Sequence, residues 1–213
     1  TSPDGVTWTG RTAAASKVWN SLAYGGGLFV AGSATGELMT SPDGTTWTSR
    51  TAAEANNLTG ITYGAGLYVA VSYAGTHRVQ TSPNGVTWTA RTHAGTAHYN
   101  AVTYARGVYV AVGGTSPNAA IMTSADGTTW TARTVPAGAG YLSHVSYGDG
   151  TFVATGGSTI LTSRDGITWT KRTAPTGVTG LAAATYRNGV WVAVAGSGTT
   201  RAASSGVQLM ADL

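Results

Sequence analysis

The stretch Thr40-Ser41-Pro42-Asp43-Gly44-Thr45-Thr46-Trp47-Thr48 recurs through this chain of 213 residues and decides its fold. We call it the tryptophan motif. Its copies start near residues 1, 40, 81, 123 and 162, and their tryptophans lie 39, 41, 42 and 39 residues apart. The five tryptophans are Trp8, Trp47, Trp88, Trp130 and Trp169. A fixed period near 40 residues indicates one supersecondary unit per copy.

Between two copies of the motif, short strands alternate with turns. In the second period, Leu58–Tyr63 carries apolar residues at alternate positions, and Leu67–Val71 is an apolar run of strand length. Arg78–Ser82 and Val86–Thr92 complete four predicted strands. Repeated groups of four antiparallel strands are typical of β-propeller blades. The sequence therefore predicts an all-β fold, a single domain over residues 1–213 that forms a five-bladed β-propeller of four-stranded antiparallel blades.

Two kinds of turn recur with the strands. In the tryptophan motif, Pro fixes φ, the next residue offers a side-chain acceptor to nearby backbone N–H groups, and Gly supplies a positive φ. These acceptors are Asp4, Asp43, Asn84, Asp126 and Asp165. The second kind, which we call the tyrosine turn, is seen in Tyr63-Gly64-Ala65-Gly66, and its last glycine is expected at positive φ. A residue present once per repeat serves the repeat itself, so we interpret both motifs as scaffold.

The two ends of the chain are predicted to close the ring. The first copy leaves Val6–Thr12 as an isolated outer strand, whereas the last blade has Leu181–Tyr186, Val190–Val194 and a strand near Thr200–Ala203. The N-terminal strand is expected to complete that blade and to hide its edge. Residues 204–213 read either as a degenerate sixth copy of the motif or as a linker. Because the chain starts within a motif, we expect it to be cut or processed from a longer polypeptide.

Composition and charge limit the function classes. Only 9% of the residues are charged, against about 25% in a typical soluble domain, and there is no cysteine. The net charge is +4, but five of the twelve Lys and Arg residues are one repeated arginine. These are Arg11, Arg50, Arg91, Arg133 and Arg172. Spread charge without a basic cluster predicts no nucleic-acid binding, and no apolar run approaches the roughly 18 residues needed for membrane insertion. This composition favours a virion or extracellular protein.

The motif resembles that of the Asp-box propellers, which carry the bacterial neuraminidase repeat. Their motif runs Ser/Thr, any, Asp, any, Gly, any, Thr, Trp between the third and fourth strands of a blade. Ser41, Asp43 and Trp47 match it in type and order, although Asp and Gly are adjacent here. The whole unit is also similar to propeller repeats of phage tail and other virion proteins and of bacterial surface proteins. The resemblance covers nearly the full chain and implies the fold, whereas function depends on the site.

By this resemblance, sialidase activity would need an arginine triad, a tyrosine nucleophile paired with a glutamate, and an acidic proton donor. The chain has only two glutamates, Glu37 and Glu54, and four of its eight acids are aspartates of the tryptophan motif. The recurrent arginines belong to outer strands. Paired carboxylates with free roles are missing. We therefore predict no enzyme, no catalytic residue and no cofactor, and keep a sialidase-like glycoside hydrolase as the last alternative.

The variable loops are predicted to gather at one end of the propeller. In an up-and-down blade, both repeated turns lie at one end, and the loops from the second to the third strand and between blades lie at the other. We call the latter end the loop face, and binding residues usually lie on such loops. The predicted ligand- or partner-binding residues are Trp19, Asn56, Tyr73, His77, His93, His98, Tyr99, Asn118 and Tyr141. The alternatives are that these loops are ordinary solvated connections and that Trp19 packs against a neighbouring blade.

Aromatic rings beside Asn and His suit a protein or glycan surface. His77, His93 and His98 are expected near the seam of the second and third blades, but no carboxylate or thiol joins them, so no metal site is predicted. The predicted function is a non-catalytic propeller module for surface recognition or assembly in a virion or extracellular protein. Its partners would be proteins of a larger assembly or a cell-surface glycan. The alternative is a lectin-like carbohydrate-binding propeller, although the varied loops repeat no pocket signature.

Overall fold

The structure is a computed structural model that describes residues 1–198 and 202–205. Within this part the chain forms antiparallel sheets, and none of it is helical. The chain divides into two compact units, Thr1–Thr92 and His93–Leu213. No helical segment in the described part could span a lipid bilayer. Residues 206–213, which hold most of the predicted sixth motif copy or linker, lie outside the described residues.

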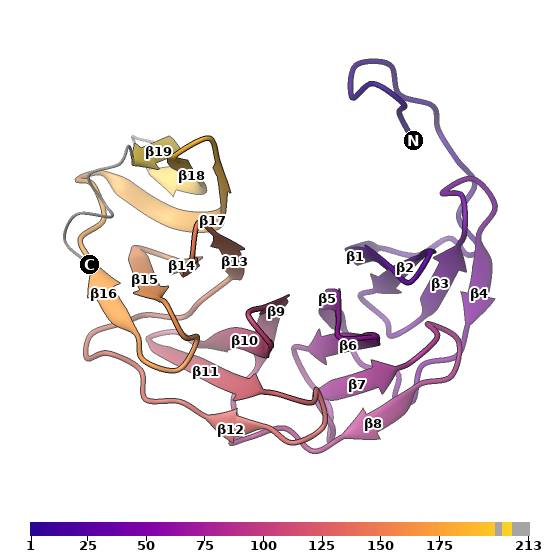
Figure 1. The fold of residues 1–213 in the computed structure, drawn as a ribbon, viewed down its shortest axis with the longest axis horizontal. Coiled ribbons are helices and arrows are strands. Elements are labelled where there is room, and N and C mark those ends of the chain that lie inside the picture. The colour runs from indigo at the N-terminus through magenta and orange to yellow at the C-terminus, as the bar shows by residue number, and fades with distance from the viewer. Residues whose placement is uncertain (199–201, 206–213) are drawn as a thin grey trace. The chain divides into compact units, whose positions relative to one another are not determined.

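The first unit contains two four-stranded sheets, each in sequential order (Figure 1). The first sheet consists of β1 (Trp19–Gly25), β2 (Leu28–Ser33), β3 (Leu38–Ser41) and β4 (Thr48–Arg50). The second consists of β5 (Leu58–Gly64), β6 (Leu67–Ser72), β7 (Val79–Ser82) and β8 (Thr89–Arg91). Every neighbouring pair is antiparallel, so each sheet is a meander built from one sequence period.

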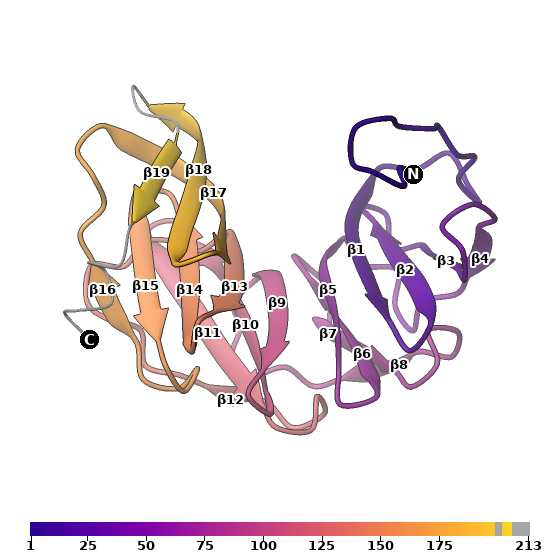
Figure 2. The ribbon, with the colours of Figure 1, turned by 45° about the horizontal axis from the view of Figure 1, so that its top comes forward.

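The second unit continues the same pattern in three sheets, seen from another side in Figure 2. The third sheet has β9 (Tyr99–Ala105), β10 (Val108–Thr115), β11 (Asn118–Ser124) and β12 (Thr131–Ala132). The fourth has β13 (His144–Gly148), β14 (Thr151–Gly156), β15 (Thr159–Ser163) and β16 (Thr170–Arg172). The fifth has three described strands, β17 (Val178–Arg187), β18 (Val190–Gly198) and β19 (Ala202–Ser205).

Five antiparallel sheets, one per sequence period, confirm the predicted all-β repeat architecture. The fourth strand of the second blade is shorter than expected. In the second blade it covers Thr89–Arg91 instead of Val86–Thr92, because Val86 to Trp88 belong to the turn of the tryptophan motif. Residues 6–12 lie in no strand, so closure of the ring by the N-terminal segment stays a prediction.

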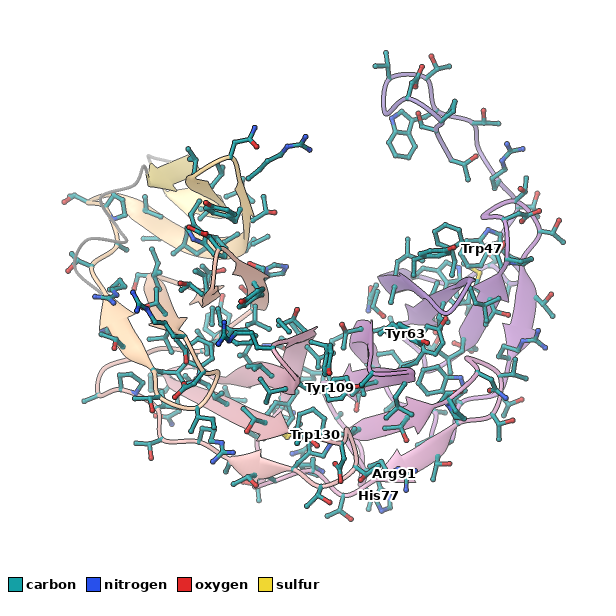
Figure 3. All side chains as sticks on the ribbon, viewed as in Figure 1. Trp47, Tyr63, His77, Arg91, Tyr109 and Trp130 are labelled. Carbon is teal, nitrogen blue, oxygen red and sulfur yellow. The ribbon has the colours of Figure 1, made fainter. Side chains whose placement is uncertain are left out.

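Each blade carries a row of aromatic rings, which we call the aromatic ladder. In the second blade, Tyr63 lies opposite Tyr68 with ring centroids 4.6 Å apart, and Tyr68 lies 6.4 Å from Trp88. Three further blades repeat the ladder with tyrosine-to-second-ring distances of 4.5, 4.5 and 4.8 Å. Figure 3 labels members of the ladder in three blades, Trp47, Tyr63, Tyr109 and Trp130. Tilted rings at these separations are favourable aromatic contacts.

The ladder of one blade seals the seam with the blade before it. The Tyr68 hydroxyl shares its single hydrogen between the carbonyl oxygens of Gly25 and, at 3.0 Å, Leu28. A Cβ built on Gly25 would overlap the ring of Tyr63, so only glycine leaves room for this ring. Trp88 is buried in one cluster with Val30 of the first blade. In the second unit, a Cβ on Gly148 would likewise collide with a tyrosine of the next blade.

Within the described residues, each unit also has a sheet with exposed apolar side chains. Leu22 in β1 is 61% exposed, whereas Ile61, at the same register of β5, is 8% exposed because the first blade covers it. In the second unit, Val194 in β18 is 48% exposed, although the corresponding Val112 in β10 is fully buried. Apolar faces of this kind usually mark surfaces that pack against something else.

The tyrosine turns are two-residue loops. Gly64 pairs with Leu67, so Ala65 and Gly66 alone form the loop, with φ of 46° and 79°. The expected positive φ at the last glycine is confirmed in all five turns. The residue before it also has a positive φ, which the sequence reasoning did not anticipate. Positive φ at both positions defines a type I′ turn, the form that matches the twist of a β-hairpin.

We expect the exchange Ala65→Asn to stabilise the protein by about 1 kcal/mol, since alanine is strained in the left-handed region and asparagine tolerates it. Asn188, at φ 51° in the fifth blade, provides the reciprocal control. Asn188→Ala should lower the free energy of unfolding by a similar amount. Urea unfolding of both variants measures the effect. Equal effects of the two exchanges in the same direction would contradict this account of the turn.

Candidate functional site

The tryptophan motif is a turn held by side-chain hydrogen bonds. The Asp43 carboxylate accepts the backbone N–H groups of Thr45 at 2.7 Å and Thr46 at 3.0 Å, and the hydroxyl of Ser41 at 2.9 Å. The Ser41 hydroxyl in turn accepts the N–H of Gly44 at 2.8 Å. Both backbone N–H groups after the aspartate are therefore satisfied without a strand partner.

The other copies make the same bonds through Asp4, Asn84, Asp126 and Asp165. In all five copies the tryptophan Nε1 donates to the carbonyl of the motif glycine. Trp88, Trp130 and Trp169 are buried, Trp47 is half-buried and Trp8 is exposed. The structure thus places these residues in the scaffold.

The repeated arginines also have one common contact. The Nε of Arg50 donates to Thr40 Oγ1 at 3.0 Å, and that of Arg91, labelled in Figure 3, donates to Thr81 Oγ1 at 2.9 Å. The sequence placed these arginines on outer strands. The bond joins the third and fourth strands of one blade. The terminal guanidinium nitrogens are left for other contacts.

Hydrogen bonding fixes the charge of the motif aspartates. The N–H groups of Thr46 and Thr45 hold the pKa of Asp43 at about 2, below its usual 3.8. The corresponding N–H groups lower the pKa of Asp126 in the same way. Burial raises the pKa of Asp165, but its backbone hydrogen bonds outweigh this effect, so the pKa is lowered there too. These aspartates are ionised acceptors and poor proton donors.

Acidification should therefore weaken the fold through these turns. A carboxyl group whose pKa is lowered by folding stabilises the protein above its unfolded pKa, and this contribution is lost as pH falls from about 4 to about 2. We expect the double variant Asp43→Asn/Asp126→Asn to show a shallower fall of the unfolding free energy across this range. Asn84 shows that the turn accepts asparagine.

The reverse exchange is the control. Asn84→Asp adds an ionisable acceptor to the third copy and should make the fall steeper over the same pH range. Denaturant titrations at a series of pH values measure both slopes. Parallel curves for the parent chain and the two variants would show that the turn aspartates do not control acid stability.

On the loop face of the first unit, Glu54 ties two loops together. One carboxylate oxygen bonds His77 Nδ1, and the other accepts the His77 backbone N–H at 3.1 Å and the Asn56 amide at 3.0 Å. The Asn56 amide also donates to the His77 carbonyl at 2.9 Å. Burial raises the pKa of Glu54, but the hydrogen bonds from His77 and Asn56 outweigh it, so the carboxylate is charged.

A buried glutamine also holds the backbone of the loop that carries Glu54. Gln80, 1% exposed, accepts the N–H groups of Ala53 at 2.7 Å and Glu54 at 3.2 Å, and donates to the Glu54 carbonyl at 2.9 Å. The sequence reasoning named Asn56 and His77 as site residues but missed their dependence on Glu54 and Gln80. The loop between the first two blades is consequently fixed before any ligand arrives.

Two further predicted residues lie in the first unit. Tyr73 is exposed, and its N–H donates to the Asn57 carbonyl at 3.1 Å. Trp19 begins β1 and is half-buried, and its indole N–H has no hydrogen-bond partner in the described part of the chain. Tyr73 can therefore contact a ligand, whereas the Trp19 ring is partly taken up by packing.

In the second unit, one predicted site residue is a packing residue. Tyr99 is 1% exposed, its hydroxyl donates to the Ala94 carbonyl at 2.7 Å, and the His93 ring meets its edge. Tyr99 therefore cannot present its ring to a ligand, because it opens the inner strand β9 and points into the blade. Asn118 begins β11 and is exposed, and Tyr141 is half-buried.

The four histidines have separate environments. His77 pairs with Glu54, His93 contacts Tyr99, and the carbonyl of His98 accepts the N–H of Gly114 at 2.8 Å. Burial lowers the pKa of His144, whose Nδ1 accepts a backbone N–H of the next blade. Among the residues that the structure describes, no three His, Cys, Asp or Glu side chains are grouped to hold a metal ion.

The sequence reasoning missed a hollow on the loop face of the second unit. It has a volume of about 460 Å³ and lies where the loop after β16 meets the turn between β14 and β15. Its walls are Ser158, Lys171, Arg172, Thr173, Ala174, Pro175 and Val178. One signal was present in the sequence. Lys171 stands where the other four motif copies have Gly, Ser or Ala.

Comparison with known proteins adds the family and the fold. A family model described as DUF6242 beta propeller domain matches residues 92–208. No curated protein matches the sequence of the chain.

Several solved structures share the fold at low identity. A chain of a nidogen/laminin complex has 12% identity and a TM-score of 0.65, over 84% of this chain and 72% of that chain. YCF48 bound to a D1 peptide has 14% identity and a TM-score of 0.66, and the match spans 89% of this chain but only 65% of YCF48. Virginiamycin B lyase from Staphylococcus aureus has 12% identity and a TM-score of 0.71, over 89% and 70% of the two chains.

Proposed function

Because this chain belongs to the family of the DUF6242 beta propeller domain, we propose that it is a non-catalytic propeller module that binds a protein partner through its loop face. The observation that carries the proposal is the hydrogen bonding of the aspartate and glutamate side chains. Every carboxylate in the described residues already has a hydrogen-bonding partner.

Four of these carboxylates hold the motif turns. Glu37 binds Lys17 at 2.5 Å, and this contact together with two hydroxyl bonds holds its pKa at about 2. Glu54 is paired with His77, and Asp149 accepts a hydrogen bond from Tyr186. Glycoside hydrolysis requires two carboxyl groups with separate acid and nucleophile or base roles. The described acids are used in structure, so recognition is the better-supported function.

The rigidity of the loop face supports recognition further. Hydrogen bonds fix the loop that carries Asn56. Tyr73 is exposed, and its backbone N–H donates to the carbonyl of Asn57 in that loop. A surface ordered before binding loses less conformational entropy when a partner arrives. Residues on loops held by a rigid scaffold are where binding sites are common.

We choose a protein or peptide ligand in preference to a cell-surface glycan. Two propellers with the same fold are described with protein ligands, one in a nidogen/laminin complex and one bound to a D1 peptide. Their identity to this chain is too low to transfer a binding site, so the partner is part of the proposal. A setting in a virion or an extracellular assembly remains a prediction from the low charge of the chain.

A displayed random peptide library tests the loop face. We expect peptides selected on the parent chain to lose at least about tenfold in affinity, roughly 1.4 kcal/mol, on the variant Tyr73→Ala/Asn118→Ala/Tyr141→Ala. The control Val86→Ala/Ile167→Ala removes exposed apolar side chains from the tryptophan motif turns and should leave affinity unchanged. Failure to enrich peptides, or equal losses in both variants, would reject loop-face recognition. Release of fluorophore from a sialoside by the parent chain would reject the non-catalytic assignment.

We also propose that the N-terminal segment is the fourth strand of the β17–β19 sheet. In the first blade, Thr48 of β4 lies opposite Thr40. The repeat makes Thr9 the counterpart of Thr48, and both Thr1 and Ser204 occupy the place of Thr40. Thr9 exchanges two backbone hydrogen bonds with Thr1 in the structure, and in the proposed closure Ser204 takes the place of Thr1. The chain has no cysteine, so Thr9→Cys/Ser204→Cys introduces a single disulfide pair. Mass spectrometry after oxidation of dilute protein should find an intramolecular bridge. Disulfide-linked dimers, or thiols that stay free, would show that the segment does not close the ring of its own chain.

A further inference from the structure

Three side chains of the fourth blade hold the inner strand of the fifth blade. The hydroxyl of Ser143, the residue before β13, donates to the Leu181 carbonyl of β17 at 2.9 Å. The Ser146 hydroxyl donates to the Ala184 carbonyl at 2.7 Å, and the Ala184 N–H donates to His144 Nδ1 at 3.4 Å. Because β13 and β17 belong to different sheets, these side chains join the two strands.

His144 supplies the acceptor in this contact. Ala184 is buried, and a buried N–H group needs a hydrogen-bond partner within the protein. A neutral imidazole accepts at one ring nitrogen and carries its proton on the other, so the bond requires the tautomer of His144 that is protonated at Nε2. A charged imidazolium has an N–H group at both nitrogens and cannot accept the Ala184 N–H.

The surroundings of His144 also disfavour a positive charge. The strands that pack against β13 are β9, β10, β14 and β17. None of the titratable or charged side chains on these strands is a carboxyl group, and they are Tyr99, Tyr104, Tyr109, Tyr186 and Arg187. β13 itself adds Tyr147, and the turn after it adds Asp149, which accepts a hydrogen bond from Tyr186. The His144 ring is half-buried, and burial lowers its pKa below the ordinary 6.5.

The other blades have no titratable group at this position. Counted three residues before the tyrosine of the tyrosine turn, the counterparts of His144 are Ser21, Gly60, Ala101 and Ala183. In the first blade, the Ser21 hydroxyl donates to the Leu58 carbonyl at 3.4 Å, and a serine hydroxyl does not titrate near neutral pH. The position is therefore titratable only in the seam between the fourth and fifth blades.

We propose that His144 is a pH-sensitive switch between the fourth and fifth blades. At neutral pH the imidazole accepts the Ala184 N–H and closes the seam between β13 and β17. Protonation removes this acceptor, leaves a buried N–H group without a partner and places a positive charge beside it. Serine side chains alone then hold the inner edge of β17. This device is independent of partner recognition at the loop face.

The direction of the pH effect follows from the lowered pKa of His144. In the unfolded chain the ring gains a proton near pH 6.5, whereas in the folded protein it does so only at lower pH. The unfolded state therefore binds more protons as the pH falls below 6.5, and the folded protein loses stability. This window lies above the range from about 4 to about 2 in which the motif aspartates titrate, so the two effects are separable.

Nuclear magnetic resonance of the full chain tests the contact directly. The ring signals of the histidines and the backbone amide signal of Ala184 are followed from about pH 8 to about pH 5 at constant ionic strength. We expect the neutral His144 ring to carry its proton on Nε2 and to titrate below pH 6.5, with the same midpoint as the Ala184 amide. A ring protonated at Nδ1, or an Ala184 amide that does not follow His144, would overturn the proposal.

An acceptor that does not titrate provides the matched variant. In His144→Gln, the side-chain carbonyl can accept the Ala184 N–H at any pH. Between about pH 7.5 and about pH 5, we expect the unfolding equilibrium constant of the parent chain to rise at least about threefold more than that of His144→Gln, as measured by denaturant titration. His144→Ser, which copies the first blade, should resemble His144→Gln, whereas His98→Gln, outside this seam, should resemble the parent chain. Equal pH dependence of the parent chain and both His144 variants would refute the switch.

Discussion

The fit of a tyrosine ring over a glycine of the preceding blade is the contact on which the rest of the structure depends. Tyr63 occupies the space that a side chain at Gly25 would need, and the neighbouring Tyr68 hydroxyl satisfies carbonyl oxygens at the end of the same hairpin. Trp88 extends the ring contacts toward the outer strand. A sheet is thereby joined to its neighbour through side chains that its own turns position. Because interiors pack closely, this seam tolerates little change at the glycine.

The repeated turns lie at one end of each blade and the variable loops at the other, which indicates where a binding site can lie. The side chains of the tryptophan motif satisfy the backbone N–H groups of their own turn, so these side chains are used in the scaffold. The other end carries loops of unequal length and sequence, and local bonds such as those of Glu54 and Gln80 order them individually. A repeated arginine can both stabilise its blade and line a surface hollow. In Arg172 one nitrogen maintains the blade, and the remaining donors border a hollow.

Much of the fold follows from sequence because its information is local and repeated. The alternation of apolar residues predicted the inner strands, and the recurring glycines predicted the positions of the turns. The positive φ of Ala65 was not foreseen, because alanine gives no sign of a left-handed conformation. The site was harder to predict. The burial of Tyr99 depends on how its strand enters the blade, and the link between Glu54 and His77 joins residues of two loops. Lys171 was visible as a departure from the repeat, but the hollow beside it needs the position of Ser158 on another turn.

The seam has a consequence for how such a chain can grow. The first and fourth blades present a glycine-backed hairpin on one side and an aromatic ladder on the other, whereas the third blade has Ala105 in place of the glycine. A repeat of the first kind contains both halves of the contact that joins it to the next. Duplication of one coding period would therefore yield a matching neighbour without compensating substitutions. Loops that contribute nothing to the seam could then diverge independently in each duplicate. Blade number and binding specificity are in this sense separate evolutionary variables.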